Sequence, residues 1–299
     1  MLNILFLLLS CASDIAIITT EQKQQDTAEA IVDIEETDTE ENDTNEYEPS
    51  SEPSDEMTDL TIGFAEMHFF QYACPACMGI SNEFDISAAL KLHQPTSGDY
   101  TDWLTPVGQC TTNLYETYVS SSPLQNSQPA NFNQLQLNPS GPGEWSIPYF
   151  YEYQYERNTS YTITTEHGII NNAFTSVEGF DSIEPYTLLW VDPSYAFDAV
   201  ISRSGTSFSW YPIVPNAQFE ILVAVYSPDG SNMLGTVSCM ENDSGYMTIP
   251  GSYFQSFPTW SLAAVYLTRH RIDRRPAPEL NGWIQSHMSW SAVGTAHIE

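Results

Sequence analysis

The feature that most constrains this fold is a two-residue hydrophobic rhythm that starts near residue 61. It is clearest in residues 84–92, where Phe84, Ile86, Ala88, Leu90 and Leu92 alternate with Asp85, Ser87, Ala89, Lys91 and, just beyond, His93. Successive side chains of a strand point to opposite faces, so this pattern predicts a half-buried strand. No segment after residue 60 shows a useful length of helical periodicity. The sequence therefore predicts an all-β protein.

Further strand patterns follow at short intervals. They lie at residues 149–156, 161–165, 187–191, 208–211, 219–226, 233–240, 246–249, 262–268 and 284–290. Recognisable turns separate several of them, at residues 140–143 (Ser-Gly-Pro-Gly), 228–230 (Pro-Asp-Gly) and 242–245 (Asn-Asp-Ser-Gly). Many short strands at this spacing favour antiparallel β-sandwiches over alternating strands and helices. Their number suits two sandwiches, which we place at residues 61–193 and 194–299.

The second of these segments resembles the immunoglobulin-like and fibronectin-like modules of bacterial surface proteins. Trp210 is followed by the strand FEILVAVYS, then by a hairpin and a strand that carries Cys239. The resemblance implies an immunoglobulin-like sandwich and a non-enzymatic role in adhesion, envelope structure or partner contact.

A strongly acidic segment precedes the predicted sandwiches. The chain has 39 acidic and 8 basic side chains, a net charge of -31, and 16 of the acids fall within residues 21–60. Low hydrophobicity and like-charge repulsion predict that residues 11–60 are a disordered spacer. The overall charge argues against nucleic acid as a partner, because nucleic-acid binding needs basic patches.

The first ten residues, MLNILFLLLS, are almost all apolar and too few to span a bilayer, which matches a secretory signal peptide. The Leu-Leu-Ser-Cys sequence ending at Cys11 resembles the lipobox of bacterial lipoproteins. That resemblance implies cleavage before Cys11, attachment of lipid and palmitate-type acyl chains to it, and a membrane anchor. The alternative is an ordinary signal peptide with an unrelated cysteine.

The residues after Cys11 bear on its destination. Ala12 and Ser13 follow it, whereas in the lipoprotein family an Asp at this place commonly means retention in the inner membrane. The resemblance therefore implies an outer-membrane lipoprotein, exposed to the periplasm or at the cell surface.

Four cysteines remain: Cys74, Cys77, Cys110 and Cys239. An even number in an exported protein predicts disulfides, and four cysteines allow three pairings. We favour Cys74 with Cys77, because a bond between Cys110 and Cys239 requires the two predicted sandwiches to touch.

The Cys74-Pro75-Ala76-Cys77 segment also supports a second hypothesis. Together with the preceding FFQYA it resembles the active-site segment of thioredoxin-like thiol oxidoreductases, which implies Cys74 as the attacking and Cys77 as the resolving thiol. That family has a long helix directly after the motif, whereas residues 84–92 have strand periodicity here. A structural zinc site from Cys74, Cys77, Cys110 and a histidine such as His68 or His93 is a further, weaker alternative, because a single C-x-x-C has no second matched pair.

Tyrosines at every second position of residues 149–155 support a third hypothesis. Tyr149, Tyr151, Tyr153 and Tyr155 would share one face of a strand and could stack on sugar rings, as in carbohydrate-binding modules; the alternative is that this face is core.

We find no other site pattern. Catalytic residues, metal ligands and cofactors are assigned to none of the remaining residues, and the six histidines are expected at the surface or in turns. The arginines at 269, 271, 274 and 275 are expected to bind carboxylates of the same protein rather than an anion.

Overall fold

A computed structural model describes residues 57, 59–72, 84–94, 105–112, 122–150, 154–185 and 199–299. Most of them belong to strands and none to a long helix, which confirms the predicted all-β class. The strands are β1 (Thr61–Tyr72), β2 (Phe84–Leu92), β3 (Gln109–Thr111), β4 (Ala130–Phe132), β5 (Leu135–Gly141), β6 (Glu144–Phe150), β7 (Ser160–Thr165), β8 (Gly168–Thr175), β9 (Glu184–Pro185), β10 (Val200–Ile201), β11 (Gly205–Tyr211), β12 (Gln218–Tyr226), β13 (Met233–Asn242), β14 (Tyr246–Pro250), β15 (Leu262–Ala277) and β16 (Gly282–Ile298). Two short 3-10 turns are η3 (Gly251–Tyr253) and η4 (Pro278–Leu280). No described helix is long and apolar enough to cross a membrane.

One large sheet organises the molecule. Its strand order is β3-β13-β12-β15-β16-β1-β2-β6-β5-β4-β7-β8, with β10 also paired to β16, and a separate small sheet has the order β14-β11-β9. Neighbouring strands are antiparallel except for the parallel pairs β1–β16 and β10–β16.

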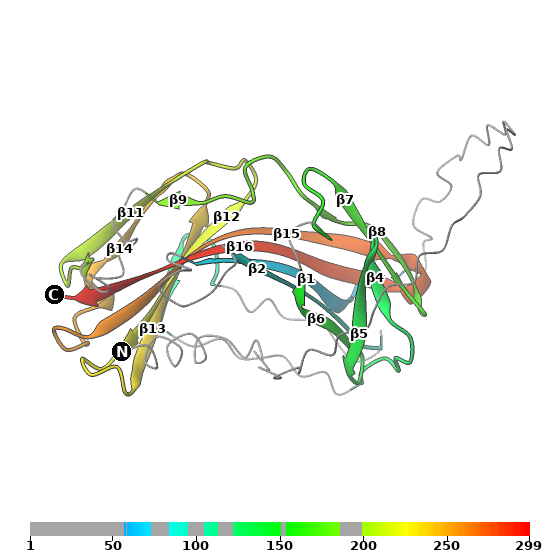
Figure 1. The fold of residues 1–299 in the computed structure, drawn as a ribbon, viewed down its shortest axis with the longest axis horizontal. Helices are drawn as coiled ribbons and strands as arrows, with labels where there is room; N and C mark the ends of the chain where they lie inside the picture. Colours follow the sequence, from blue (N-terminus) through cyan, green and yellow to red (C-terminus); the bar gives the residue numbers. More distant parts are fainter. Residues whose placement is uncertain are drawn as a thin grey trace, which may run out of the picture.

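The hairpin of β15 and β16 forms the spine of the fold. These strands have 16 and 17 residues, about 50 Å at the rise of an extended strand, and they run from one end of the molecule to the other in Figure 1. The tight turn between them uses Pro278 and a left-handed Asn281 (φ 55°). The carboxylate of Glu279, in the same turn, accepts a hydrogen bond from the backbone N–H of Ile169 at 2.9 Å and so attaches the hairpin tip to β8.

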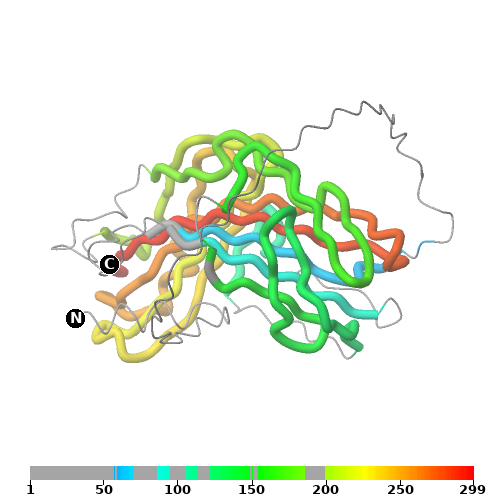
Figure 2. Tube along the Cα trace, turned by 45° about the vertical axis from the view of Figure 1, so that its right-hand side comes forward, coloured from blue at the N-terminus to red at the C-terminus, as the bar shows by residue number. Residues whose placement is uncertain are grey.

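A second layer covers the spine at each end (Figures 1 and 2). At the end drawn on the right, β8 and its partner β7 fold back over β15. Within the large sheet, Phe69 of β1 stacks on Trp290 of β16 with ring centroids 5.0 Å apart. At the left-hand end the small sheet lies over β12, where Trp210 stacks on Phe219 at 3.6 Å. One large apolar cluster runs through both ends on the same face of the sheet.

The sheet crosses the predicted boundary at residues 193 and 194. β1, from the first predicted segment, pairs with β16, from the second, over residues Thr61–Tyr72 and Trp283–Val293. β3 likewise pairs with β13. The division into two immunoglobulin-like sandwiches stays a prediction, and strands from both segments share one sheet.

The hydrophobic rhythm predicted strands with one buried face well. The strand at 84–92 has the predicted bounds, and Ile86, Ala88, Leu90 and Leu92 are buried as expected. All three predicted turns connect strands or lie next to them. The predicted strand at 187–191 lies outside the described residues. The strand expected to run through 149–156 ends at Phe150.

Candidate functional site

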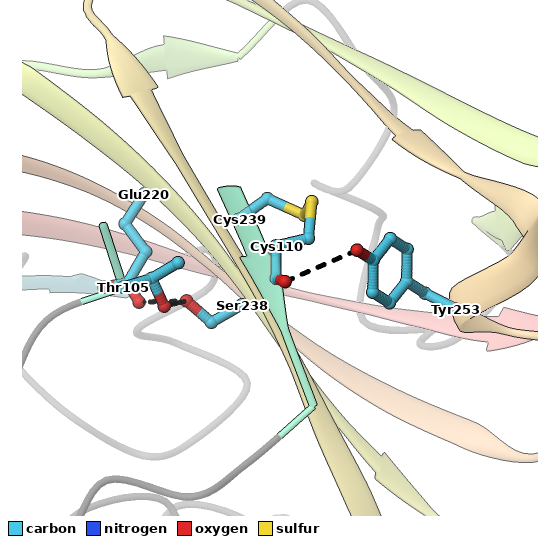
Figure 3. Close-up of a disulfide and its surroundings, with 6 residues drawn as sticks. All are labelled: Thr105, Cys110, Glu220, Ser238, Cys239 and Tyr253. Carbon is cyan, nitrogen blue, oxygen red and sulfur yellow. Dashed lines mark hydrogen bonds between the residues drawn. A yellow bond between two sulfur atoms is a disulfide. The ribbon is translucent and has the colours of Figure 1, made fainter. Parts of the chain in front are cut away.

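A row of buried polar side chains crosses the large sheet on the face opposite the main core. It starts at Thr105, whose Oγ1 lies 2.6 Å from Oγ of Ser238 on β13, and Ser238 donates to Oε1 of Glu220 on β12 at 2.5 Å. Figure 3 shows this end of the row beside β3. The other carboxylate oxygen of Glu220 lies 3.1 Å from Nε2 of His270 on β15, and Nδ1 of His270 lies 2.7 Å from Nε2 of His287 on β16.

The contacts in this row restrict the hydrogen-bond roles of its members. An ionised Glu220 can only accept, so Nε2 of His270 donates to it. Of Nδ1 of His270 and Nε2 of His287, one must donate to the other. Burial and the neighbouring His270 and His68 hold the pKa of His287 well below its usual value, which agrees with a neutral ring.

Strand β1 adds two titratable side chains beside this row. Nδ1 of His68 lies 2.5 Å from Oγ of Ser289, and burial, with a smaller effect of His270, lowers the pKa of His68 to about 4. Glu66 is the register partner of His287, and burial raises the pKa of Glu66 to about 7 against a partial opposing effect of Lys91 on β2. Strand β1 thus places one acid and one base with shifted pKa values beside the row of Glu220, His270 and His287.

We expect His68 and Glu66 to give the stability of the protein opposite pH dependences. The unfolded chain protonates His68 below about 6.5 and the folded chain only below about 4, so this residue costs up to about 3 kcal/mol of unfolding free energy as pH falls through that window. Folded Glu66 keeps its proton up to about pH 7 and unfolded Glu66 only up to about 4.5, so its cost grows as pH rises between them. Urea unfolding from pH 4 to 8 measures both.

The variants His68→Gln and Glu66→Gln separate the two effects. The stability of His68→Gln relative to the unchanged protein should improve as pH falls, and that of Glu66→Gln should improve as pH rises. Each variant is the control for the other, because general acid or alkaline weakening would move both differences in the same direction. Differences that do not vary with pH would show that neither group is perturbed by burial.

The histidine prediction was wrong for several positions. His93, His270, His287 and His297 are buried rather than at the surface. Sequence reasoning missed them because the polar side chains at positions 268 and 270 of β15 and at 287, 289 and 291 of β16 break the apolar pattern. Within each strand these polar positions are two residues apart, so they share one face, and this spacing was the signal in the sequence. No group of His, Cys, Asp or Glu side chains that could hold a metal ion is found in the described part of the chain.

The disulfide lies on the other face of β13, next to the start of the polar row. Cys110 and Cys239 are directly opposite each other on β3 and β13, and their Sγ atoms are bonded (Figure 3). Tyr253 Oη donates to the carbonyl of Cys110 at 3.4 Å. The predicted disulfide chemistry is thus present, in a pairing that we had not favoured. Cys74 and Cys77 lie outside the described residues, as does Cys11.

The four clustered arginines all contact carboxylates of the chain itself, which confirms the interpretation of that cluster. The pairs are Arg269 with Asp243 (2.8 Å), Arg271 with Asp273 (3.7 Å), Arg274 with Asp59 (2.8 Å) and Arg275 with Asp273 (2.9 Å). Arg274 also lies over the ring of Trp283, with its guanidinium carbon 4.8 Å from the centroid.

Arg269 is the most deeply buried of these arginines and joins several segments. Besides the Nε contact with Asp243, its Nη1 donates to the carbonyls of Gly179 (2.8 Å) and Ser182 (2.7 Å), and its Nη2 donates to the carbonyl of Pro212. The guanidinium and the carboxylate side chains are both fully buried.

Asp243 is held from a second side as well. Its Oδ1 accepts from the indole N–H of Trp210 at 2.8 Å, and its Oδ2 accepts from the backbone N–H of Val214 at 3.0 Å. This contact set connects β15 to both the small sheet and the loop at residues 179–182. It is structural: the charges neutralise each other and face no open surface.

The tyrosine row is described only in part. Tyr155 is buried, its ring lies 4.6 Å from that of Phe69, and its Oη lies 2.5 Å from Oγ of Ser176. Burial raises the pKa of Tyr155 above its usual value. This residue is therefore part of the core and is not open to a ligand. Tyr151 and Tyr153 lie outside the described residues, and the side chain of Tyr149 is likewise not described.

No protein-family model matches the chain, and no curated protein matches it. Function must therefore be inferred from the residues and their geometry.

Proposed function

We propose that this protein is an exported lipoprotein, anchored through Cys11, that holds a rigid β-structured body at the bacterial outer membrane for adhesion, envelope structure or partner contact. The apolar segment that ends in Leu-Leu-Ser-Cys at Cys11 carries the anchoring part of the proposal. The acidic residues 11–60 would act as the spacer between lipid and body.

The observation that supports export is the disulfide between Cys110 and Cys239. Disulfides of this kind persist in oxidising compartments and are rare where thiols are kept reduced. Its two cysteines are far apart in sequence and directly opposite each other in the sheet, so the bond joins β3 covalently to β13 and does not close a local loop.

The alternative of a thiol oxidoreductase is weakened by the position of β2. That strand starts at Phe84, so only residues 78–83 separate it from Cys77. The long helix that lowers the pKa of the attacking thiol in thioredoxin-like proteins has no room directly after the motif. We therefore favour a non-enzymatic role.

Lipidation of Cys11 is the test of this proposal. In a Gram-negative host, the mature protein should begin at Cys11, carry acyl chains detectable by mass spectrometry and partition into detergent. The Cys11→Ala variant should lose the acyl mass and the detergent partitioning and retain the Cys110–Cys239 bond. A mature protein cut elsewhere and free of lipid would contradict the proposed anchor and support an ordinary signal peptide.

A further inference from the structure

The outer face of the small sheet carries an unusual set of exposed side chains. In β11 and β14 the side chains of Phe208, Trp210, Met247 and Ile249 point inward and are buried. The alternate positions must then point outward, and among them Tyr211 and Tyr246 are 54% and 56% exposed. Large aromatic side chains of a soluble protein are normally much less exposed than this, and here two occur on one face.

The hydroxyl groups of Ser207 and Thr248 hold Tyr246 in place. Its Oη donates to Oγ of Ser207 at 2.9 Å and accepts from Oγ1 of Thr248 at 2.8 Å, and Ser207 and Thr248 are themselves 2.8 Å apart. Ser207 and Thr248 are opposite each other in the register of β11 and β14. These bonds also lower the pKa of Tyr246 below its usual value.

The triangle of hydroxyls determines how the Tyr246 ring lies. Thr248 is two residues farther along the same face, about 6.5–7 Å at the rise of a strand. The Oη atom reaches it only if the side chain lies along the strand, whereas strand side chains usually stand away from the sheet. The side chain of Tyr246 is therefore held along the strand by its hydroxyl, and 56% of its surface remains exposed. Tyr246 is a fixed, exposed aromatic side chain on this face.

Tyr211 adds a second exposed aromatic side chain to this face. Tyr246 is opposite Ser209, and Tyr211 is two residues beyond Ser209 in the direction away from Ser207 and Thr248, so the two tyrosines are separate contacts along the face. Glu184 of β9 is the register partner of Tyr211 and is exposed. The face thus combines two aromatic side chains, neutral hydroxyls and one acceptor carboxylate.

We infer that this face binds a neutral polysaccharide, with pyranose rings stacked on Tyr246 and Tyr211. A pyranose has an apolar C–H face that suits an aromatic platform, and peripheral hydroxyls that suit Ser207, Thr248 and Glu184. Glu184 and the net charge of -31 repel anionic polymers. An extended peptide would pair with the edge of a strand and would not need exposed tyrosine side chains on the outer face of the small sheet. This inference deepens the proposed display function by naming its partner class, and in that sense it rests on it.

Affinity electrophoresis of the purified protein in gels that contain dextran, mannan or a soluble β-glucan tests the inference, with polygalacturonate as the anionic control. At least one neutral polysaccharide should retard the protein, and polygalacturonate should not. Tyr246→Ala should weaken that binding by about tenfold or more, the effect of removing a central aromatic contact. Tyr246→Phe, which keeps the ring and loses its hydroxyl, should bind between the two.

Trp260→Ala is the matched control. Trp260 is 61% exposed but belongs to none of β9, β11 and β14 and is stacked on His297, so its loss should leave retardation unchanged. Equal unfolding midpoints of the variants would show that the fold is intact. The inference is overturned if no neutral polysaccharide retards the protein, if Tyr246→Ala binds as well as the unchanged protein, or if only polygalacturonate or an unfolded polypeptide such as casein is bound. The measurement does not depend on acylation, so failure of the lipid anchor would leave its result interpretable.

Discussion

Replacing Arg269 with methionine is expected to lower the free energy of unfolding by about 3–5 kcal/mol, because it removes one partner of a buried ion pair. Asp243 would keep only the N–H donors of Trp210 and Val214 for a fully buried charge. The carbonyls of Gly179 and Ser182 would also lose their donor. Urea unfolding at pH 7 with a two-state fit gives the measurement.

Arg274→Met is the matched control for this prediction. Arg274 makes an equally short contact with Asp59, at 2.8 Å, but the Asp59 side chain is 91% exposed. An exposed pair of this kind contributes about 0–1 kcal/mol. If Arg269→Met leaves too little folded protein to measure, Arg269→Lys keeps the charge, loses the planar fork of donors, and should still cost more than Arg274→Met. Equal small losses at both positions would contradict the structural role assigned to Arg269.

Removing the disulfide with the double variant Cys110→Ala/Cys239→Ala should cost about 3–5 kcal/mol. The two cysteines are separated by 129 residues, so the bond removes a large amount of chain entropy from the unfolded state. β3 has only three residues, and its described pairing is with β13 alone, so little else holds it to the sheet edge. Urea unfolding of the double variant, and of the unchanged protein with dithiothreitol, measures the loss.

A second double variant, Cys74→Ala/Cys77→Ala, separates this effect from the other predicted bond. A bridge across so short a loop can contribute only about 2 kcal/mol in the same model. The variant that lacks Cys110 and Cys239 should therefore be the less stable of the two. If the Cys110→Ala/Cys239→Ala variant is as stable as the unchanged protein, the Cys110–Cys239 bond does not stabilise the fold.

Some strands were predictable because one of their faces is buried and the other is not. Strand β2 shows this directly: its buried Leu90 and Leu92 alternate with half-buried Ala89 and Lys91. In β15 and β16 most positions on both faces are buried, so the alternation that marks a strand disappears. The sequence consequently predicted short strands at 262–268 and 284–290 in place of a hairpin of 16 and 17 residues.

The candidate sites were predictable only where the signal was local. The arginine cluster could be assigned to carboxylates from charge alone, because acids greatly outnumber bases. The row from Glu220 through His270 to His287 could not, since its members lie on separate strands that only the strand order brings together. The same holds for Tyr246, whose neighbour Ser207 is 39 residues away.

The sequence by itself determined the class of this protein, because a two-residue rhythm and well-placed turn residues are properties of neighbouring positions. It also determined where the negative charge lies. Only the tertiary structure decided that β1 lies parallel to β16, that Cys110 joins Cys239, and that histidines expected at the surface are buried. Pairing between distant strands depends on which faces fit together after the chain has folded back on itself. Local periodicity depends on neighbouring residues alone and therefore does not predict which distant strands pair.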